Sequence, residues 1–155
     1  MTRRITMTNR ILAAVALMLG ISFGTNASEC ELSLEANDMM QYDSKLLSVP
    51  ASCKEVSITL THTGTLPAQA MGHNLVITDT VNVQAVGTDG MAAGFDNNYV
   101  KPGDERVYAA SKVIGGGESV ILSFSTEKLT AGGDYSFFCS FPGHWAIMQG
   151  KFEFK

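Results

Sequence analysis

Short segments in which apolar and polar residues alternate, separated by turn residues, constrain the fold of this chain more than any other feature. The alternating segments lie at residues 30–35, 56–61, 120–125, 135–139 and 152–154. The turn residues between them are Gly64, Pro102, Gly103, Gly115, Gly116, Gly117, Gly132, Gly133, Pro142 and Gly143. A period of two buries one side of each segment, as in a β-strand. Many short strands with regular turns predict an all-β fold, an antiparallel β-sandwich.

The stretch from Thr80 to Asn98 departs from this alternation. Its apolar residues follow no period of two, and Gly90 and Gly94 interrupt it. We expect an insertion that contains a short helix and lies outside the sheets. The sequence shows no internal repeat and no linker after residue 28, so residues 28–155 are predicted to form one domain.

Residues 1–27 have the pattern of a secretory signal peptide. Arg3, Arg4 and Arg10 are followed by the apolar run 11–21, and the segment ends in small residues at Ala27. The apolar run is short for a bilayer span, which takes about 20 residues. We expect cleavage after Ala27, with an uncleaved anchor as the alternative.

The composition excludes two classes of protein. Removing residues 1–27 takes away three arginines and no acid, which changes the net charge from −4 to −7. A nucleic-acid binder needs a basic surface to replace counterions on the phosphates, so we expect no nucleic-acid partner. Hydrophobic residues make up 45% of the chain and charged residues 17%, which argues against intrinsic disorder.

Three cysteines follow the signal segment: Cys30, Cys53 and Cys139. In an oxidising compartment an odd number indicates one disulfide and one thiol with another role. Cys30 and Cys53 lie in the N-terminal part amid ordinary alternation, whereas Cys139 lies far away in a segment rich in other donors. We therefore pair Cys30 with Cys53 and leave Cys139 free.

The segment 135–148 carries the strongest functional signal. It holds a thiol, an imidazole and a thioether in the spacing Cys139-x4-His144-x3-Met148, with a turn at Pro142. One tight loop can therefore direct all three side chains at a single point. Soft sulfur donors with imidazole favour copper, whereas magnesium and calcium prefer oxygen ligands.

A trigonal site of this kind needs a second imidazole, and the chain offers His62 and His73. His73 is the better candidate, because Gly72 before it lets the backbone approach the site closely. His62 is interpreted as a structural histidine. Two histidines and one cysteine in a plane, with a weak axial methionine, are the arrangement of electron-transfer copper sites.

The sequence resembles the azurins, the small blue-copper proteins of bacteria, over nearly the whole of residues 28–155. The resemblance is carried by residues 71–74, by residues 86–91 and by residues 137–148, and the Cys30–Cys53 pair matches as well. It implies a cupredoxin-like Greek-key sandwich of about eight strands with a helical flap. It also implies a soluble periplasmic carrier of single electrons that cycles between Cu(II) and Cu(I).

The resemblance also assigns roles to individual residues. His73, Cys139 and His144 would bind one type 1 copper ion in a plane, with Met148 and the carbonyl oxygen of Gly72 as axial ligands. Asn74 and the backbone amide of Phe141 would donate hydrogen bonds to the Cys139 sulfur and so tune the potential.

The implied partners are other redox proteins, such as c-type cytochromes and copper nitrite reductases or similar oxidases. We expect a monomer without a membrane span once the signal is removed, which passes electrons through the exposed edge of His144 during transient docking. The candidate apolar patch consists of Met40, Leu66, Met71, Phe141, Pro142 and Trp145. Trp145 has two interpretations, a docking or electron-coupling residue and a residue that packs locally against the loop.

Two other functions use the same residues. Cys139 and His144 could act as nucleophile and base of an enzyme, but no third orienting group is evident in the loop, and we expect no catalysis. Zinc also accepts one cysteine and two histidines, and would make the protein colourless and redox-silent.

Overall fold

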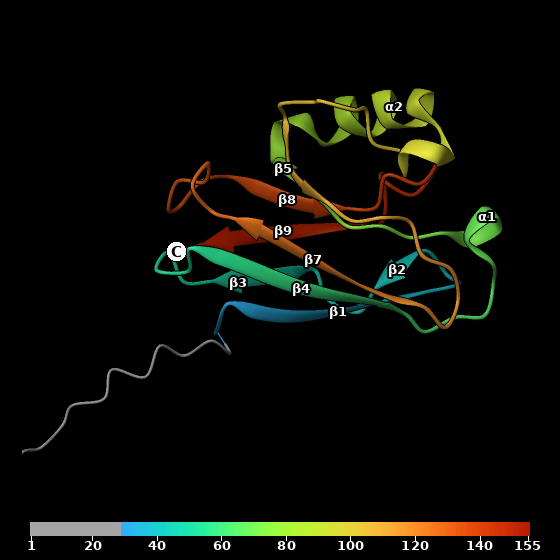
Figure 1. The fold of residues 1–155 in the computed structure, drawn as a ribbon, viewed down its shortest axis with the longest axis horizontal. Helices are drawn as coiled ribbons and strands as arrows, with labels where there is room; N and C mark the ends of the chain where they lie inside the picture. The colour runs from blue at the N-terminus through green and yellow to red at the C-terminus, as the bar shows by residue number, and fades with distance from the viewer. Residues whose placement is uncertain (1–28) are drawn as a thin grey trace, which may run out of the picture.

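The computed structural model describes residues 29–155, so the expected signal peptide of residues 1–27 lies outside the described residues. Two sheets pack face to face (Figure 1). The first has the strand order β2 (Gln41–Tyr42), β1 (Glu31–Asn37), β4 (Glu55–His62) and β7 (Ser119–Ser125). The second has the order β3 (Leu46–Val49), β9 (Gln149–Phe154), β8 (Tyr135–Phe138), β5 (Val76–Asp79) and β6 (Val107–Ala110).

The alternation in the sequence is the burial pattern of the strands. In β4, Val56, Ile58 and Leu60 are fully buried between the sheets, and the residues between them are only half-buried. In β7, Ile121 points outward and is 66% exposed. The predicted sandwich is confirmed, and the structure divides it into nine strands within residues 29–155, close to the expected eight.

The sheets are mixed rather than purely antiparallel. β1 runs parallel to β4, and β3 runs parallel to β9, while the other pairs are antiparallel. The expectation of antiparallel pairing is corrected in these two places. Period-two alternation reports which side of a strand is buried and contains no information on the direction of its neighbour.

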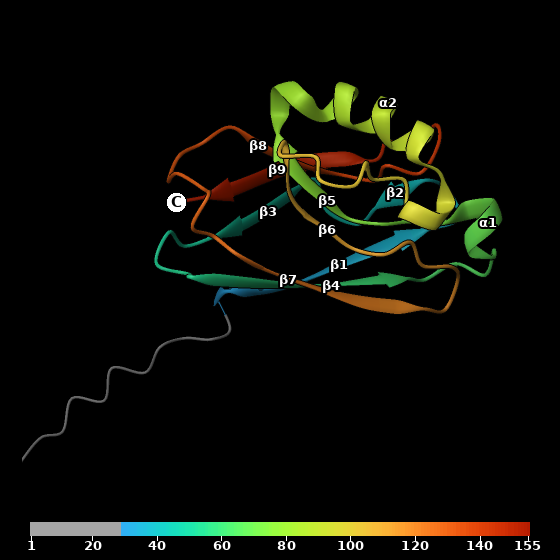
Figure 2. The ribbon, with the colours of Figure 1, turned by 45° about the horizontal axis from the view of Figure 1, so that its top comes forward.

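The predicted insertion is helical. It contains the 3₁₀ turn η2 (Thr80–Asn82), the helix α2 (Val83–Ala93) and the 3₁₀ turn η3 (Phe95–Asn97). Figure 2 shows α2 as a separate layer beside the second sheet. The buried positions of α2 are Val83, Val86, Gly87 and Gly90, spaced as one face of a helix. All four residues of β8 are buried, because α2 and the first sheet cover its two sides.

An ion-pair cluster ties α2 to the segment that leads into β6. The Arg106 guanidinium contacts Asp89 of α2 at 2.6 Å and Asp104 at 2.5 Å. Its hydrogen bonds lower the pKa of the Asp104 carboxyl. Within residues 29–155, no helix is both long enough and apolar enough to cross a bilayer.

The pairing of Cys30 with Cys53 is confirmed, since the two residues form a disulfide with a sequence separation of 23. Cys30 directly precedes β1 and Cys53 precedes β4, the strand that runs parallel to it. The bond therefore joins the starts of two neighbouring strands. Cys139 is the free cysteine among the described residues, and it is buried.

Candidate metal centre

The predicted ligands come from two separate parts of the sequence that meet at one end of the second sheet. Cys139 directly follows β8, and the loop from Cys139 to Met148 leads into β9. His73 lies between the short helix α1 (Ala68–Met71) and β5, which pairs antiparallel with β8. The same end of the sandwich holds α1 and the connection between β8 and β9 (Figure 2).

Three donor atoms converge in this region. The Nδ1 atom of His144 lies 3.5 Å from the Cys139 sulfur, and that of His73 lies 3.8 Å from it. The three donor atoms lie within 4.8 Å of one another, and all three residues are buried. Met148 is fully buried in the same loop. Side chains of a thiol, two imidazoles and a thioether therefore gather as the sequence predicts.

Backbone hydrogen bonds hold the ligand loop in a compact turn. The amide of His144 donates to the Phe141 carbonyl, and the amide of Met148 donates to the His144 carbonyl at 2.8 Å. The amide of Cys139 donates to the Met148 carbonyl at 3.0 Å, which closes the loop. Three of the four side-chain donors are thereby fixed relative to one another.

His73 is held from both sides. Its Nε2 atom donates to the Asn37 carbonyl at 2.8 Å, which leaves Nδ1 to face the Cys139 sulfur. Its backbone pairs with Ile114 through two hydrogen bonds. Fixing the second ring nitrogen in this way orients a metal-binding histidine and sets its tautomer.

Gly72 occupies a place that admits no side chain. A Cβ atom there would lie 2.3 Å from the Ala68 carbonyl oxygen and 2.5 Å from a methyl group of Val113. The carbonyl oxygen of Gly72 lies 4.0 Å from the Cys139 sulfur. The expected close approach of the backbone to the site is thus present, and we propose that this carbonyl would be a further, weak ligand of the metal ion.

Burial controls the charge of the donors. It raises the pKa of the Cys139 thiol to about 12, and the nearby backbone N–H groups of Asn74 and Phe141 oppose part of this rise. Burial also lowers the pKa values of His73 and His144 to about 4, so both imidazoles are neutral at pH 7. Neutral imidazoles are ready to bind a cation, and a buried thiolate needs a positive charge beside it. The donor set therefore fits a bound metal ion.

Asn74 connects the two halves of the site. Its side-chain oxygen accepts a hydrogen bond from the Ser140 amide at 2.9 Å. Its side-chain nitrogen donates to the Ser140 hydroxyl and to the Asn98 carbonyl, both at 2.8 Å. Asn98 in turn accepts a hydrogen bond from the Val113 amide. We propose that the backbone amide of Asn74, with that of Phe141, donates to the Cys139 sulfur.

We expect Asn74→Leu to lower the free energy of unfolding by about 2 kcal/mol, because it leaves the buried Ser140 amide without an acceptor. Thermal unfolding of the copper-loaded protein measures the loss. Asn97→Leu is the matched control, since Asn97 is exposed and its side chain bonds only the Ala93 carbonyl. Equal losses in the two variants would contradict the role of the Asn74 network.

His62 lies outside the group of donors, in line with its interpretation as structural. Its Nε2 atom bonds the Met71 carbonyl at 2.9 Å, and its Nδ1 atom accepts from the Gly64 amide at 3.0 Å. Both ring nitrogens are therefore used within the protein. The ring packs against His73, with centroids 4.5 Å apart.

Several residues that support the site carry no signal in the sequence. The Lys45 ammonium donates to the carbonyls of Ile147 and Gln149, which flank Met148. The Asn37 carbonyl fixes His73. The acceptors in these contacts are backbone carbonyls, which every residue has. No sequence motif can therefore indicate them.

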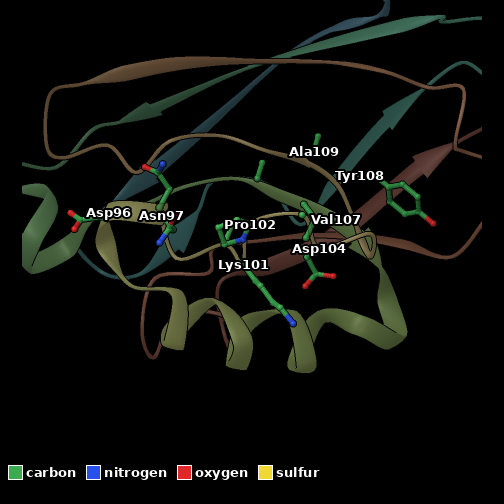
Figure 3. Close-up of a pocket in the computed structure, with 12 residues that line it drawn as sticks. Asp96, Asn97, Lys101, Pro102, Asp104, Val107, Tyr108 and Ala109 are labelled. Atoms are coloured by element: carbon green, nitrogen blue, oxygen red, sulfur yellow. The ribbon is translucent and has the colours of Figure 1, made fainter.

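A separate hollow lies between the segment 96–104 and β6 (Figure 3). Its labelled polar side chains include Asn97, Lys101 and Asp104, and the lining contains no cysteine, histidine or methionine. The carboxylate of Asp104 is already paired with Arg106. This hollow therefore offers no soft donor set like that at the end of β8.

A family profile described as copper binding proteins, plastocyanin/azurin family, matches residues 28–155. The chain belongs to this family. An azurin of Bordetella pertussis is 51% identical over 147 residues, covering 95% of this chain and 98% of that protein. An azurin of Alcaligenes faecalis is 55% identical over 124 residues, covering 80% of this chain and 97% of that protein.

A solved structure of an azurin from Methylomonas sp. strain J is similar in fold, with a TM-score of 0.78 and 40% identity. The match covers 81% of this chain and 98% of the azurin. Together with the donor geometry, membership of the plastocyanin/azurin family makes the site a type 1 copper site with His73, Cys139, His144 and Met148. The chain is a one-electron carrier with one copper ion.

The predicted apolar patch is only partly exposed. Leu66 is 39% exposed and Pro142 is exposed, whereas Met40, Met71 and Trp145 are half-buried. The Phe141 side chain is buried at 7% exposure, so it stabilises the loop from inside. Two exposed apolar residues near the site were not predicted, Met39 at 67% and Ile147 at 55%.

Proposed function

We propose that electrons enter and leave this protein at the end of the sandwich where His144 lies, during brief docking with other redox proteins. The position of His144 carries the proposal. The predicted exposed edge of His144 is corrected by the structure, because the residue is only 3% exposed and lies beneath its exposed loop neighbours Pro142, Ala146 and Ile147. A ligand ring that lies just beneath such neighbours offers a short path between a partner and the buried donors.

A bound copper ion supplies the change between Cu(II) and Cu(I). The residues of the chain supply a donor arrangement that resists change. His73 is fixed by the Asn37 carbonyl, and His144 is fixed by its place in the hydrogen-bonded turn. Close packing of the sandwich opposes movement of these groups. Electron transfer then needs little rearrangement of the protein.

The docking surface in this proposal is the apolar patch around the ligand loop: Met40, Leu66, Met71, Pro142 and Trp145, extended by Met39 and Ile147. A small apolar surface is suited to short-lived complexes between monomers more than to permanent assembly. We propose c-type cytochromes and nitrite reductases or similar oxidases as the class of partner.

We further propose that residues 1–27 direct export and that residues 28–155 form the periplasmic domain. The basic residues followed by a short apolar run support this division. A disulfide between Cys30 and Cys53 also suits an oxidising compartment. N-terminal sequencing of the exported protein tests the cleavage site after Ala27.

The buried position of Cys139 argues against a second candidate function, nucleophilic catalysis. Its side chain is fully buried, and burial raises its pKa to about 12. Reactive cysteines are partly exposed and carry lowered pKa values. We therefore favour electron transfer over thiol chemistry at this site.

Leu66→Lys tests the docking surface, because a charge placed in an apolar contact must be desolvated when two molecules meet. We expect its electron self-exchange rate, measured by NMR on mixed oxidised and reduced protein, to fall about tenfold, which corresponds to about 1.4 kcal/mol. The absorption spectrum should not change, since Leu66 is not a ligand.

Val81→Lys is the matched control for this experiment. Val81 is 86% exposed and follows β5, at the opposite end of that strand from His73. It adds the same charge to the protein far from the donors, so we expect self-exchange to change less than about twofold. Equal slowing by the two substitutions would show a general charge effect and contradict the proposed surface.

A further inference from the structure

Trp145, the residue after His144, lies against the helix α2. Its half-buried side chain packs on a cluster separate from the main core. The buried members of this cluster are Val76, Val83, Val86 and Phe138. They come from β5, from α2 and from β8, so the indole joins the ligand loop to three other elements.

A notch in α2 receives the indole. A Cβ atom at Gly87 would lie 2.8 Å from Cγ, 2.9 Å from Cδ1 and 3.2 Å from Cβ of Trp145. Gly87 has an ordinary helical position, so its lack of a side chain serves this contact rather than an unusual backbone angle. Glycine inside a helix makes the helix less stable than alanine does at the same position. The close approach of Trp145 gives a reason for a glycine at this position.

The loop has few other inward contacts. Pro142, Gly143, Ala146 and Ile147 are all exposed. Gly143 has a φ of 83°, which permits a sharp change of chain direction just before His144. Between this turn and Met148, the side chains that face the protein interior are those of His144 and Trp145.

We propose that Trp145 is a positioning residue for electron transfer. Its indole, seated in the notch at Gly87, fixes the ligand loop to α2 and so fixes the orientation of the His144 ring. Trp145 thereby acts through His144, whether or not it also touches a partner. The helix α2, which contributes no donor, becomes part of the support of the metal centre.

A double-mutant cycle tests the contact itself. We expect Gly87→Ala to lower the Tm of the copper-loaded protein, because the added methyl group displaces the indole. In the Trp145→Ala background the two nearest carbons, Cγ and Cδ1, are gone and only the Cβ contact at 3.2 Å remains, so the preference of helices for alanine should prevail and the same substitution should raise the Tm, by at most about 3 °C. The sign of the effect therefore reverses.

Gly90→Ala is the matched control on the same face of α2. Its added Cβ atom would lie 2.1 Å from the Tyr99 carbonyl oxygen, so the clash does not involve Trp145. We expect it to lower the Tm in both backgrounds. If Gly87→Ala also lowers the Tm equally in both backgrounds, the proposed notch is wrong.

Two further measurements separate positioning of the ligand from stability alone. In the reduced protein, Trp145→Ala should increase hydrogen exchange at the Ile147 and Met148 amides at least about tenfold. In the oxidised protein, it should alter the copper hyperfine splitting of the EPR spectrum, and Trp145→Phe should restore part of the original value. An unchanged exchange rate and an unchanged EPR spectrum would overturn the proposal. Slower self-exchange alone would then assign Trp145 to docking.

Discussion

Cys139→Ser is expected to abolish the intense visible absorption of the copper-loaded protein. Copper–thiolate bonding in a site with two imidazoles and a distant methionine is the defining feature of a blue-copper centre. The Cys139 sulfur lies 3.8 Å from the Nδ1 atom of His73 and 3.5 Å from that of His144, and it is the one thiol in this group of donors. Titration with Cu(II), followed by optical spectroscopy before and after adding a reductant, measures the loss.

The fold should survive this substitution. Serine is close to cysteine in size, and the backbone of residue 139 keeps its hydrogen bond to the Met148 carbonyl. Far-UV circular dichroism checks the fold. A variant that keeps the original visible band would contradict the role of Cys139 as a copper ligand. A parent protein that stays colourless at full copper occupancy would contradict the blue-copper assignment and make zinc the better candidate.

Removal of the disulfide is expected to have the largest effect on stability. In Cys30→Ala/Cys53→Ala the unfolded chain gains conformational entropy, because the disulfide no longer closes a loop with a sequence separation of 23. The free energy of unfolding should therefore fall by about 3 kcal/mol. For a domain of this size the Tm should fall by about 10 °C. Differential scanning calorimetry of the copper-loaded protein measures the change.

The same variant also serves as a control for Cys139→Ser. The disulfide joins the starts of β1 and β4, whereas the donors lie beyond the end of β8, so the visible absorption should be preserved. A loss of absorption without unfolding would show that the disulfide supports the metal centre directly. A fall in Tm of less than about 2 °C would contradict the chain-entropy argument.

Residue type and spacing were sufficient to predict the core positions, the helical insertion and the metal-binding side chains. The alternation in β4 identified Val56, Ile58 and Leu60 as core residues, and all three are fully buried. The sequence also indicated the helical insertion at 80–98. Among the donors, His144 and Cys139 were indicated by one short loop, and His73 by the glycine before it.

Features that depend on the backbone or on distant neighbours were not predictable. The parallel pairs of β1 with β4 and of β3 with β9 follow from the path of the chain, which alternation does not encode. The hydrogen bond from His73 to the Asn37 carbonyl could not be predicted either, because any residue at position 37 has a backbone carbonyl. The partnership of Gly87 with Trp145 joins residues that are far apart in the chain, so neither residue alone indicates it.

The place of β9 in the second sheet has a consequence for synthesis. β9 (Gln149–Phe154) is the last strand of the described residues, yet it lies between β3 and β8 in the sheet. β3 therefore pairs with a strand about 100 residues later in the chain, and β9 is synthesised after every other strand of this sheet. Until β9 has been synthesised, β3 has no partner and β8 has an unpaired edge, and such open strand edges are prone to aggregation.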